Sequence, residues 1–168
     1  RNAPYNYSWD WSAAGEQHVW LAIHVADKTG KVTYDPGGWV EVDLDKTSPS
    51  AEIITPASGA YLTGNNVQIS ALASDSGSGV GSVQFFAGYA DGSGEYWHDL
   101  GFDTNGSDGW NKSWDVSSVN DQRDVSFFVY AYDRANNYMG AATWATVLDR
   151  VPPTSAVQGL PATSPASF

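Results

Sequence analysis

The sequence predicts an all-β protein built from antiparallel two-sheet sandwiches. Three observations predict this class: an internal repeat, short apolar runs that alternate with a period of two, and frequent turn residues between those runs. Charged residues make up only 16% of the chain, whereas glycine occurs 17 times and proline 8 times. This balance favours short strands joined by polar turns over helices. The hydrophobic share of 42%, with 14% aromatic residues, is enough to fill a core without disulfides or metals.

The internal repeat has a period of about a hundred residues, the size of one common domain. Lys112-Ser-Trp-Asp115 repeats the pattern of Tyr7-Ser-Trp-Asp10, and similar runs follow each of them. The matching pairs of segments are 7–10 with 112–115, 19–27 with 125–133, and 40–46 with 144–150. We therefore expect the chain to be a window cut from a tandem array of similar units.

One complete unit is expected over residues 47–150. Residues 1–46 correspond to only the last three strands of a preceding unit, and residues 151–168 to the first strand of a following one. Three strands alone would expose an unpaired edge and half a core. Two completions remain open: further sequence of the same chain, or strands supplied by another chain, as in a filament whose subunits exchange strands.

The first half of the complete unit contains strands separated by clear turn signals. Residues 51–55 form an extended segment that Pro56 ends, which fits an edge strand because proline lacks the N–H that a central strand needs. Residues 66–74 are apolar at every second position, as expected for a strand with one buried face. Residues 83–89 form the next strand, and Asp91-Gly92 turns the chain back because this pair accepts the positive φ of a hairpin turn.

The second half contains the most hydrophobic strand. Residues 110–116 form a strand after a glycine-rich excursion, and residues 125–132 alternate so strongly that they should lie centrally. A tight turn over 133–137 leads to the last strand, 141–148, with one face made of Trp144, Thr146 and Leu148. Seven short strands within about a hundred residues, with no helical period between them, specify a sandwich.

Four motifs in these turns carry a resemblance to a known family. They are Asp45-Lys-Thr-Ser-Pro-Ser50, Pro56-Ala-Ser-Gly59, Ser74-Asp-Ser-Gly-Ser-Gly-Val80 and Tyr132-Asp-Arg-Ala-Asn-Asn137. The chain resembles the bacterial immunoglobulin-like (Ig-like) domains, close to fibronectin type III, that occur in tandem on large exported proteins. The resemblance implies an Ig-like sandwich, an extracellular or cell-surface location, and a structural spacer or adhesive role. Many relatives have Ala-Gly-Asn in the last turn where this chain has Ala135-Asn-Asn137, a mild departure because asparagine also tolerates the left-handed conformation.

The acidic composition excludes two classes of partner. A formal net charge of −11 and a pI near 4.3 argue against nucleic acid and against an anionic membrane surface, since both need a cationic face. The remaining expected partners are neighbouring Ig-like units, in the same chain or in adjacent subunits, and a polysaccharide. The chain has no cysteine, so disulfides give no evidence on its compartment.

No pattern in the sequence supports catalysis. His18, His24 and His98 fall on different predicted strands or units, and none forms a spaced pair of zinc ligands. A Gly-x-Ser-x-Gly nucleophile motif does not occur. We therefore expect a non-enzymatic protein, with calcium as the one cofactor worth considering.

Four carboxylates are candidates for that calcium site. In a sandwich of this topology, the loops after the second and sixth core strands emerge at the pole that faces the preceding unit. Asp75 and Asp133 lie in those loops, and Asp43 and Asp45 lie in the linker, so the four could converge. The alternative is that Asp75 and Asp133 each accept backbone N–H groups within their own turns.

A second candidate site is an aromatic platform for a sugar ring. Its residues cluster around the predicted hairpin: Tyr89, Tyr96, Trp97 and Trp110, with His98 and Asp99 to bind hydroxyl groups. The chain would then be a carbohydrate-binding module attached to a secreted hydrolase. The alternative is that these rings pack against their neighbours on an edge strand. Trp9, Trp39, Trp114 and Trp144 recur at matching or near-matching places in the two units and are expected to be packing residues.

Overall fold

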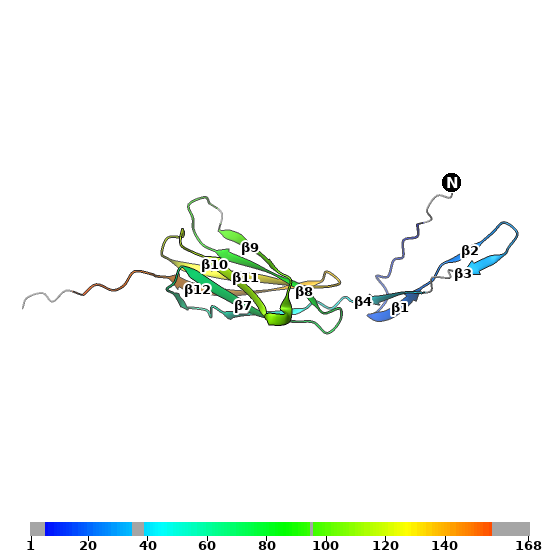
Figure 1. The fold of residues 1–168 in the computed structure, drawn as a ribbon, viewed down its shortest axis with the longest axis horizontal. Helices are drawn as coiled ribbons and strands as arrows, with labels where there is room; N and C mark the ends of the chain where they lie inside the picture. Colours follow the sequence, from blue (N-terminus) through cyan, green and yellow to red (C-terminus); the bar gives the residue numbers. More distant parts are fainter. Residues whose placement is uncertain (1–5, 35–38, 95, 156–168) are drawn as a thin grey trace, which may run out of the picture.

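The protein consists of two parts that lie end to end, as Figure 1 shows. The structure is a computed structural model that describes residues 6–34, 39–94 and 96–155. These residues form strands and one short 3-10 helix, and none of their helices is long and apolar enough to cross a membrane. The elements of the first part are β1 (Gln17–Leu21), β2 (His24–Ala26), β3 (Val32–Tyr34) and β4 (Val40–Leu44). Those of the second part are β5 (Ser50–Thr55), β6 (Tyr61–Leu62), β7 (Asn66–Ser74), β8 (Val80–Gly88), β9 (Trp97–Asp103), η1 (Gly106–Asp108), β10 (Trp110–Asp115), β11 (Gln122–Asp133) and β12 (Tyr138–Leu148).

The second part is a sandwich of two sheets. One sheet has the strand order β10-β7-β5, and the other has the order β6-β12-β11-β8-β9. All pairs are antiparallel except β6, which runs parallel to the end of β12. The all-β, Ig-like sandwich predicted from the turn motifs and the alternating runs is therefore confirmed.

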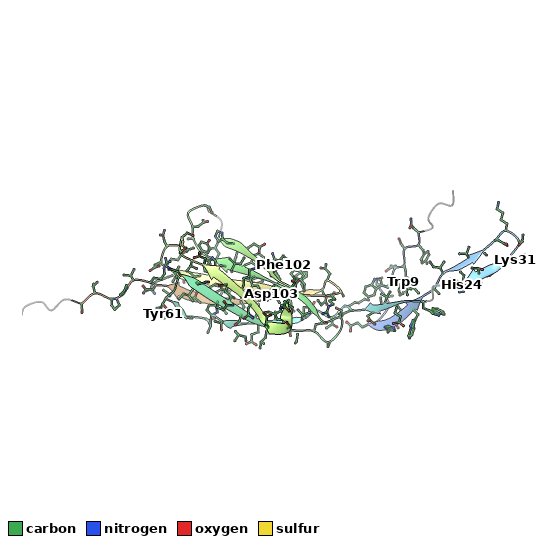
Figure 2. The ribbon with its side chains drawn as sticks, in the orientation of Figure 1. Trp9, His24, Lys31, Tyr61, Phe102 and Asp103 are labelled. Atoms are coloured by element: carbon green, nitrogen blue, oxygen red, sulfur yellow. The ribbon has the colours of Figure 1, made fainter. Side chains whose placement is uncertain are left out.

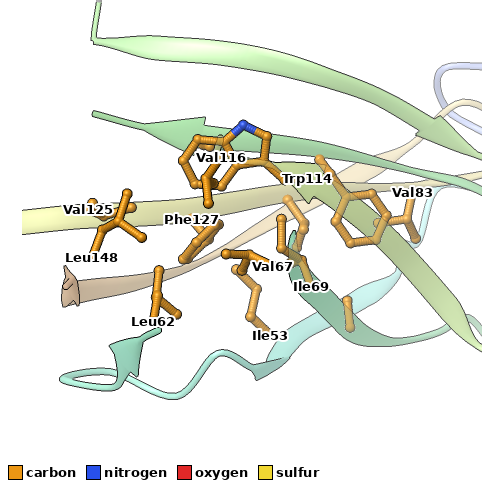
Figure 3. Packing of buried hydrophobic residues seen from close by; sticks show 14 of the residues in the cluster. Ile53, Leu62, Val67, Ile69, Val83, Trp114, Val116, Val125, Phe127 and Leu148 are labelled. Carbon is orange, nitrogen blue, oxygen red and sulfur yellow. The ribbon is translucent and has the colours of Figure 1, made fainter. Parts of the chain in front are cut away.

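Strand β11 is the centre of the core, as its alternation predicts. Its inward residues Val125, Phe127 and Val129 are fully buried in one cluster with Ile53, Val67 and Ile69 of the other sheet. Figure 3 shows part of this cluster, including Val125 and Phe127. Strand β11 pairs with β12 on one side and β8 on the other, so its backbone groups are satisfied within the sheet. Strand β5 lies at the edge of its sheet and ends just before Pro56, as the missing proline N–H requires.

The last strand differs from its prediction at Trp144. The sequence suggested that Trp144 shares one face with Thr146, but Trp144 is 54% exposed and Thr146 is fully buried. The reason is a β-bulge: Ala145 has a φ of 60°, and the register with β11 shifts between Val125 and Phe127. One inserted residue reverses the direction of the side chains before it. Thr143 thus takes the inner position, where it is 6% exposed.

The first part is a long two-stranded hairpin. Strand β1 pairs with β4, so that Gln17 lies opposite Leu44 and Leu21 lies opposite Val40. Strand β2 pairs with β3 farther from the sandwich. By the repeat, these strands correspond to β11 and β12. The sequence also suggested a strand near Tyr7, but residues 6–10 form none. Their counterpart β10 is a strand because it pairs with β7, and residues 6–10 have no such partner in the described part of the chain.

The hairpin leaves its inner face exposed. Leu21, Ile23 and Val25, the counterparts of the buried residues of β11, are 43%, 65% and 60% exposed. The described residues of the first part supply no second sheet to cover them. Residues 151–155 form no strand, and the expected first strand of a following unit otherwise lies outside the described residues.

A basic side chain after the last strand connects the end of that strand to the turn between β10 and β11. The guanidinium of Arg150 donates hydrogen bonds to the carbonyl oxygens of Val116 (2.9 Å) and Val119, and to the Asp121 carboxylate (2.6 Å). The backbone N–H of Arg150 also donates to Asp121. These bonds tie the end of β12 to the turn between β10 and β11. We call this arrangement the closing lock.

The same lock recurs in the first part, at the positions that the repeat predicts. The ammonium of Lys46 donates to the carbonyl oxygens of Trp11 (3.4 Å) and Ala14 (2.6 Å), and the backbone N–H of Lys46 donates to the Glu16 carboxylate (3.1 Å). Trp11, Ala14 and Glu16 correspond to Val116, Val119 and Asp121. The repeat therefore extends from the sequence to individual hydrogen bonds.

Replacement of the lock cation should destabilise the sandwich. We expect Arg150→Ala to lower the free energy of unfolding by about 2 kcal/mol, because partly buried carbonyl groups and Asp121 lose a charged donor. The melting temperature should then fall by roughly 10 °C. Arg123→Ala, which removes an exposed arginine of β11, serves as the control. Equal melting temperatures of the two variants in circular dichroism would contradict a role for the lock.

Candidate cation site at the junction

Three carboxylates meet at the pole of the sandwich that faces the hairpin. Asp45 follows β4, Asp75 follows β7, and Asp133 ends β11. One oxygen atom of each lies within 4.8 Å of an oxygen of the other two. Asp45 and Asp133 are 6% and 5% exposed, so two of the three charges are largely removed from water. The loops and the linker predicted to converge at this pole therefore do converge.

Asp45 ties the linker to the sandwich. One carboxylate oxygen accepts the N–H of Ser78 at 2.7 Å, and the other accepts the N–H of Thr47 at 3.0 Å. The backbone carbonyl of Asp45 accepts a hydrogen bond from the Asn137 side chain at 3.2 Å. Two hydrogen bonds from Ser78 lower the pKa of Asp45 because they favour the ionised form of the carboxylate. The bond from the Ser78 hydroxyl has the larger effect, and the bond from its N–H has the smaller one. The linker is thus fixed to two loops of the next unit.

Asp75 is the carboxylate with spare coordination capacity. Its Oδ2 accepts the N–H groups of Gly77 at 3.0 Å and Gly79 at 2.7 Å, as the Asx-turn alternative expects. Its Oδ1 is buried and has no hydrogen-bond partner in the part of the chain that the structure describes. A buried carboxylate oxygen without a partner is costly, and this atom is able to accept a hydrogen bond or to coordinate a cation.

Asp133 is held by the turn that it opens. It accepts hydrogen bonds from the N–H and the side-chain amide of Asn137, both at 2.7 Å. The corresponding turn of the hairpin has the same construction, because Asp27 accepts the N–H of Lys31 at 3.0 Å. Asn136 and its counterpart Gly30 both adopt positive φ, 71° and 84°. Asparagine therefore fills the left-handed position that glycine fills in the other unit.

Gly77 allows the close approach of Asp45. A Cβ at position 77 would lie 2.5 Å from the Asp45 carboxylate carbon. We expect Gly77→Ala to displace the linker and to lower the melting temperature, because that contact is far inside van der Waals distance. Gly64→Ala is the matched control, since its Cβ would approach nothing closer than 3.8 Å. Identical thermal denaturation of the two variants would show that the linker does not rest on this loop.

Asp43, the fourth predicted ligand, lies outside the cluster. It sits on β4 opposite His18, and its carboxylate is 2.5 Å from the imidazole Nδ1. The hydrogen bond with Asp43 is the main cause that raises the pKa of His18 above 6.5, and the charge of Glu41 contributes. Cross-strand register therefore directs Asp43 to a histidine instead of the cation site.

The titration of His18 provides a test of this pair. A raised pKa means that the folded hairpin binds the proton more tightly, so the pair stabilises the hairpin below pH about 6.5 and loses this effect as pH rises through the folded pKa. Asp43→Asn should lower the pKa of His18 toward 6.5, as measured by the imidazole NMR signals. Asp108→Asn, in η1 of the sandwich, should leave it unchanged. An unaltered His18 titration in Asp43→Asn would contradict the assignment.

The residues of the predicted sugar platform do not form one surface. Tyr89 stacks on His98 with centroids 4.1 Å apart and contacts the buried Trp114. Trp97 instead contacts Phe128 and Trp144 on the outer face of its sheet. Adjacent residues of β9 point to opposite faces, which separates Trp97 from His98.

The other members of the platform have local partners. The Tyr96 hydroxyl donates to the carbonyl oxygen of Asp124 at 2.6 Å, and Asp99 accepts a hydrogen bond from Gln84 at 3.0 Å. Trp110 belongs to β10 in the opposite sheet and covers Gly106. Of the four tryptophans expected to pack, Trp114 is 7% exposed, whereas Trp9, Trp39 and Trp144 are 43%, 68% and 54% exposed.

Sequence reasoning missed the donors that position the acidic cluster. Ser78 and Asn137 hold the Asp45 segment, and Arg134 donates to the Ser78 carbonyl at 3.0 Å. The only available signal was the serine- and asparagine-rich character of the two turns, which is common to many loops. Contact between loops distant in the sequence is decided by the fold.

Comparison with known proteins agrees with this architecture. Residues 49–126 match the family described as bacterial Ig domain. Among solved structures, the fibronectin(III)-like modules of Clostridium thermocellum CbhA are similar over 86% of this chain and 70% of that chain, with a TM-score of 0.52 and 18% identity. An engineered protein is similar over 61% of this chain and 20% of that chain, with a TM-score of 0.42 and 19% identity. A search of curated protein sequences gives no match.

These findings define the class of the sandwich. The match to the bacterial Ig domain falls within β5 to β11, and the likeness to fibronectin(III)-like modules rests on the fold alone. The central unit therefore has an Ig-like sandwich fold and is similar to bacterial Ig domains over residues 49–126.

Proposed function

We propose that this chain is a non-catalytic spacer segment of an exported bacterial protein, in which Ig-like units follow one another at fixed junctions. The observation that carries the proposal is the closing lock, which occurs at Arg150 and again at Lys46. Because the same lock ends both units, each unit can be followed by another in the same way. The linker supports the same role, because Asp45 is bound by Ser78 and Asn137 of the next unit. Adhesion through such an array remains compatible with this role.

A stiff junction can be tested by distance measurement between the two units. The chain has no cysteine, so spin labels at Lys28→Cys in the hairpin and Ser118→Cys in the sandwich would be unique. We expect one narrow distance distribution by electron paramagnetic resonance. Asp45→Ala should broaden it, whereas Asp115→Ala, which alters an Asx turn at the opposite pole, should not. A broad distribution in the unmodified chain would refute the stiff spacer.

A divalent cation would complete the junction, and we assign this role to calcium. The carboxylates of Asp45, Asp75 and Asp133 are oxygen ligands, which calcium prefers at 2.3–2.6 Å, and their separation of up to 4.8 Å suits one shared ion. The unpartnered Oδ1 of Asp75 supports the assignment. Without a cation, three clustered carboxylates repel one another, two of them in a largely buried setting.

Thermal melting with calcium tests the site. Millimolar CaCl2 should raise the melting temperature by several degrees, because a ligand bound only by the native state adds stability of about 1–3 kcal/mol at 10 to 100 times its dissociation constant. Asp75→Asn should abolish the shift in melting temperature. In EDTA this variant should be at least as stable as the unmodified chain, because the asparagine keeps a hydrogen-bond acceptor and removes a negative charge from the cluster. Asp115→Asn should keep the full shift. No shift in the unmodified chain would overturn the site.

The exposed face of the hairpin favours a second candidate, a filament subunit completed by strands of another chain. Leu21, Ile23 and Val25 form the inner face of half a sandwich, and the equivalent face of β11 is fully buried. An apolar face of this kind binds strands that complete the missing sheet. Sedimentation at high micromolar concentration should show assembly that Ile23→Lys weakens. A strictly monomeric mass would eliminate this candidate and would leave the spacer role intact.

A further inference from the structure

The outer face of the five-stranded sheet carries a continuous run of aromatic rings. Each ring contacts the next: Trp144 and Trp97 have centroids 5.9 Å apart, and Trp97 and Phe128 have centroids 6.0 Å apart. The run continues from Phe128 to Tyr130 at 4.6 Å and from Tyr130 to Tyr138 at 5.6 Å. The aromatic strip consists of Trp144, Trp97, Phe128, Tyr130, Tyr132 and Tyr138.

The register of the sheet places these rings on one face. Phe128, Tyr130 and Tyr132 alternate with the buried inner residues of β11, so they must all point outward. The bulge at Ala145 turns Trp144 to the same side. The strip is open to solvent at both ends, since Trp144 is 54% and Tyr138 is 58% exposed.

A glycine beneath the strip lets two rings pack against the backbone. A Cβ at position 140 would lie 2.6 Å from Cζ of Phe128 and 3.3 Å from a ring carbon of Tyr130. Gly140 pairs with Tyr130 across the two strands, so these rings lie across β12 where a side chain would otherwise stand. The middle of the strip is therefore held in place before any ligand arrives.

The internal repeat preserves the closing lock and the turn but not the β11 rings of the strip. The hairpin has the same closing lock and the same Asp-to-N–H turn as the sandwich. Yet the positions that correspond to Phe128, Tyr130 and Tyr132 are Ala22, His24 and Ala26. The rings that β11 contributes to this face are thus absent from the matching hairpin positions, and apolar side chains gathered on one partly exposed face indicate a binding function.

The chemistry of the strip matches an uncharged sugar polymer. Its six side chains carry no charge, and the chain as a whole has a net charge of −11, which disfavours acidic ligands. Ring faces suit the apolar C–H face of a sugar, and the three tyrosine hydroxyls can bind its hydroxyl groups. Gln84 and Asp99, hydrogen-bonded to each other at 3.0 Å, add polar groups beside the strip.

We propose that the aromatic strip of the central unit binds a neutral polysaccharide. The site extends along β11 and β12 and includes Trp97 of β9, and its Tyr132 and Tyr138 end lies beside the turn that holds Asp133. The binding function goes beyond the spacer role, because a unit that only separates other domains needs no such surface.

The experiment measures the fraction of protein retained by insoluble cellulose, chitin and xylan, with circular dichroism to verify folding. The unmodified chain should bind at least one of them. Trp144→Ala and Tyr138→Ala, at exposed positions that should fold normally, should each weaken binding by roughly tenfold, the effect of losing about 1.4 kcal/mol of stacking. Trp9→Ala removes a tryptophan that is 43% exposed before β1, in the other part of the chain (Figure 2), and should bind as the unmodified chain does.

Three results would overturn the proposal. The first is that the unmodified chain binds none of the three polysaccharides. The second is that the Trp144 and Tyr138 variants bind as strongly as the Trp9 variant. The third is that the strip variants change self-association in sedimentation without any polysaccharide binding, which would assign the face to protein contacts. None of these results affects the calcium shift or the interunit distance, so the spacer proposal is judged separately.

Discussion

The alternation of β11 is the constraint on which the rest of the structure depends. Val125, Phe127, Val129 and Ala131 must be buried between the two sheets, and all four are fully buried. Once they are fixed, the residues between them must point outward, and Asp133 must arrive at the pole where the linker enters. The core, the outer aromatic face and the acidic cluster therefore share a single register. A slip of one residue would bury the aromatic rings of the outer face and expose the core.

The junction combines hydrogen bonds between the linker and the next unit with an electrostatic cost. Hydrogen bonds from Ser78 and Asn137 bind the linker to loops of the next unit, and the closing lock secures the strand ends on which those loops depend. The same convergence brings three carboxylates together in a largely buried place. A shared cation would offset this repulsion, so the proposed stiffness and the proposed calcium site would have one structural origin.

Particular residues show how far prediction could go. The buried face of β7 and the turn chemistry of Asp75 and Asp133 followed from local patterns and the topology of a sandwich. The prediction for Asp43 was wrong because its pairing with His18 is set by the strand register of the hairpin, and the sequence alone does not determine that register. Trp144 was misplaced because no sequence signal marks the bulge at Ala145, a residue that rarely adopts positive φ.

The sequence by itself determined the repeat, the all-β class and the identity of the turns, because these depend on local periodicity and on residues with special backbone freedom. Only the tertiary structure decided which groups meet: the lock between Arg150 and Asp121, the approach of Asp45 to Asp75, and the contact of Trp144 with Trp97. These contacts join segments far apart in the chain. Their formation depends on strand register and on the packing of the two sheets, and both are properties of the folded molecule as a whole.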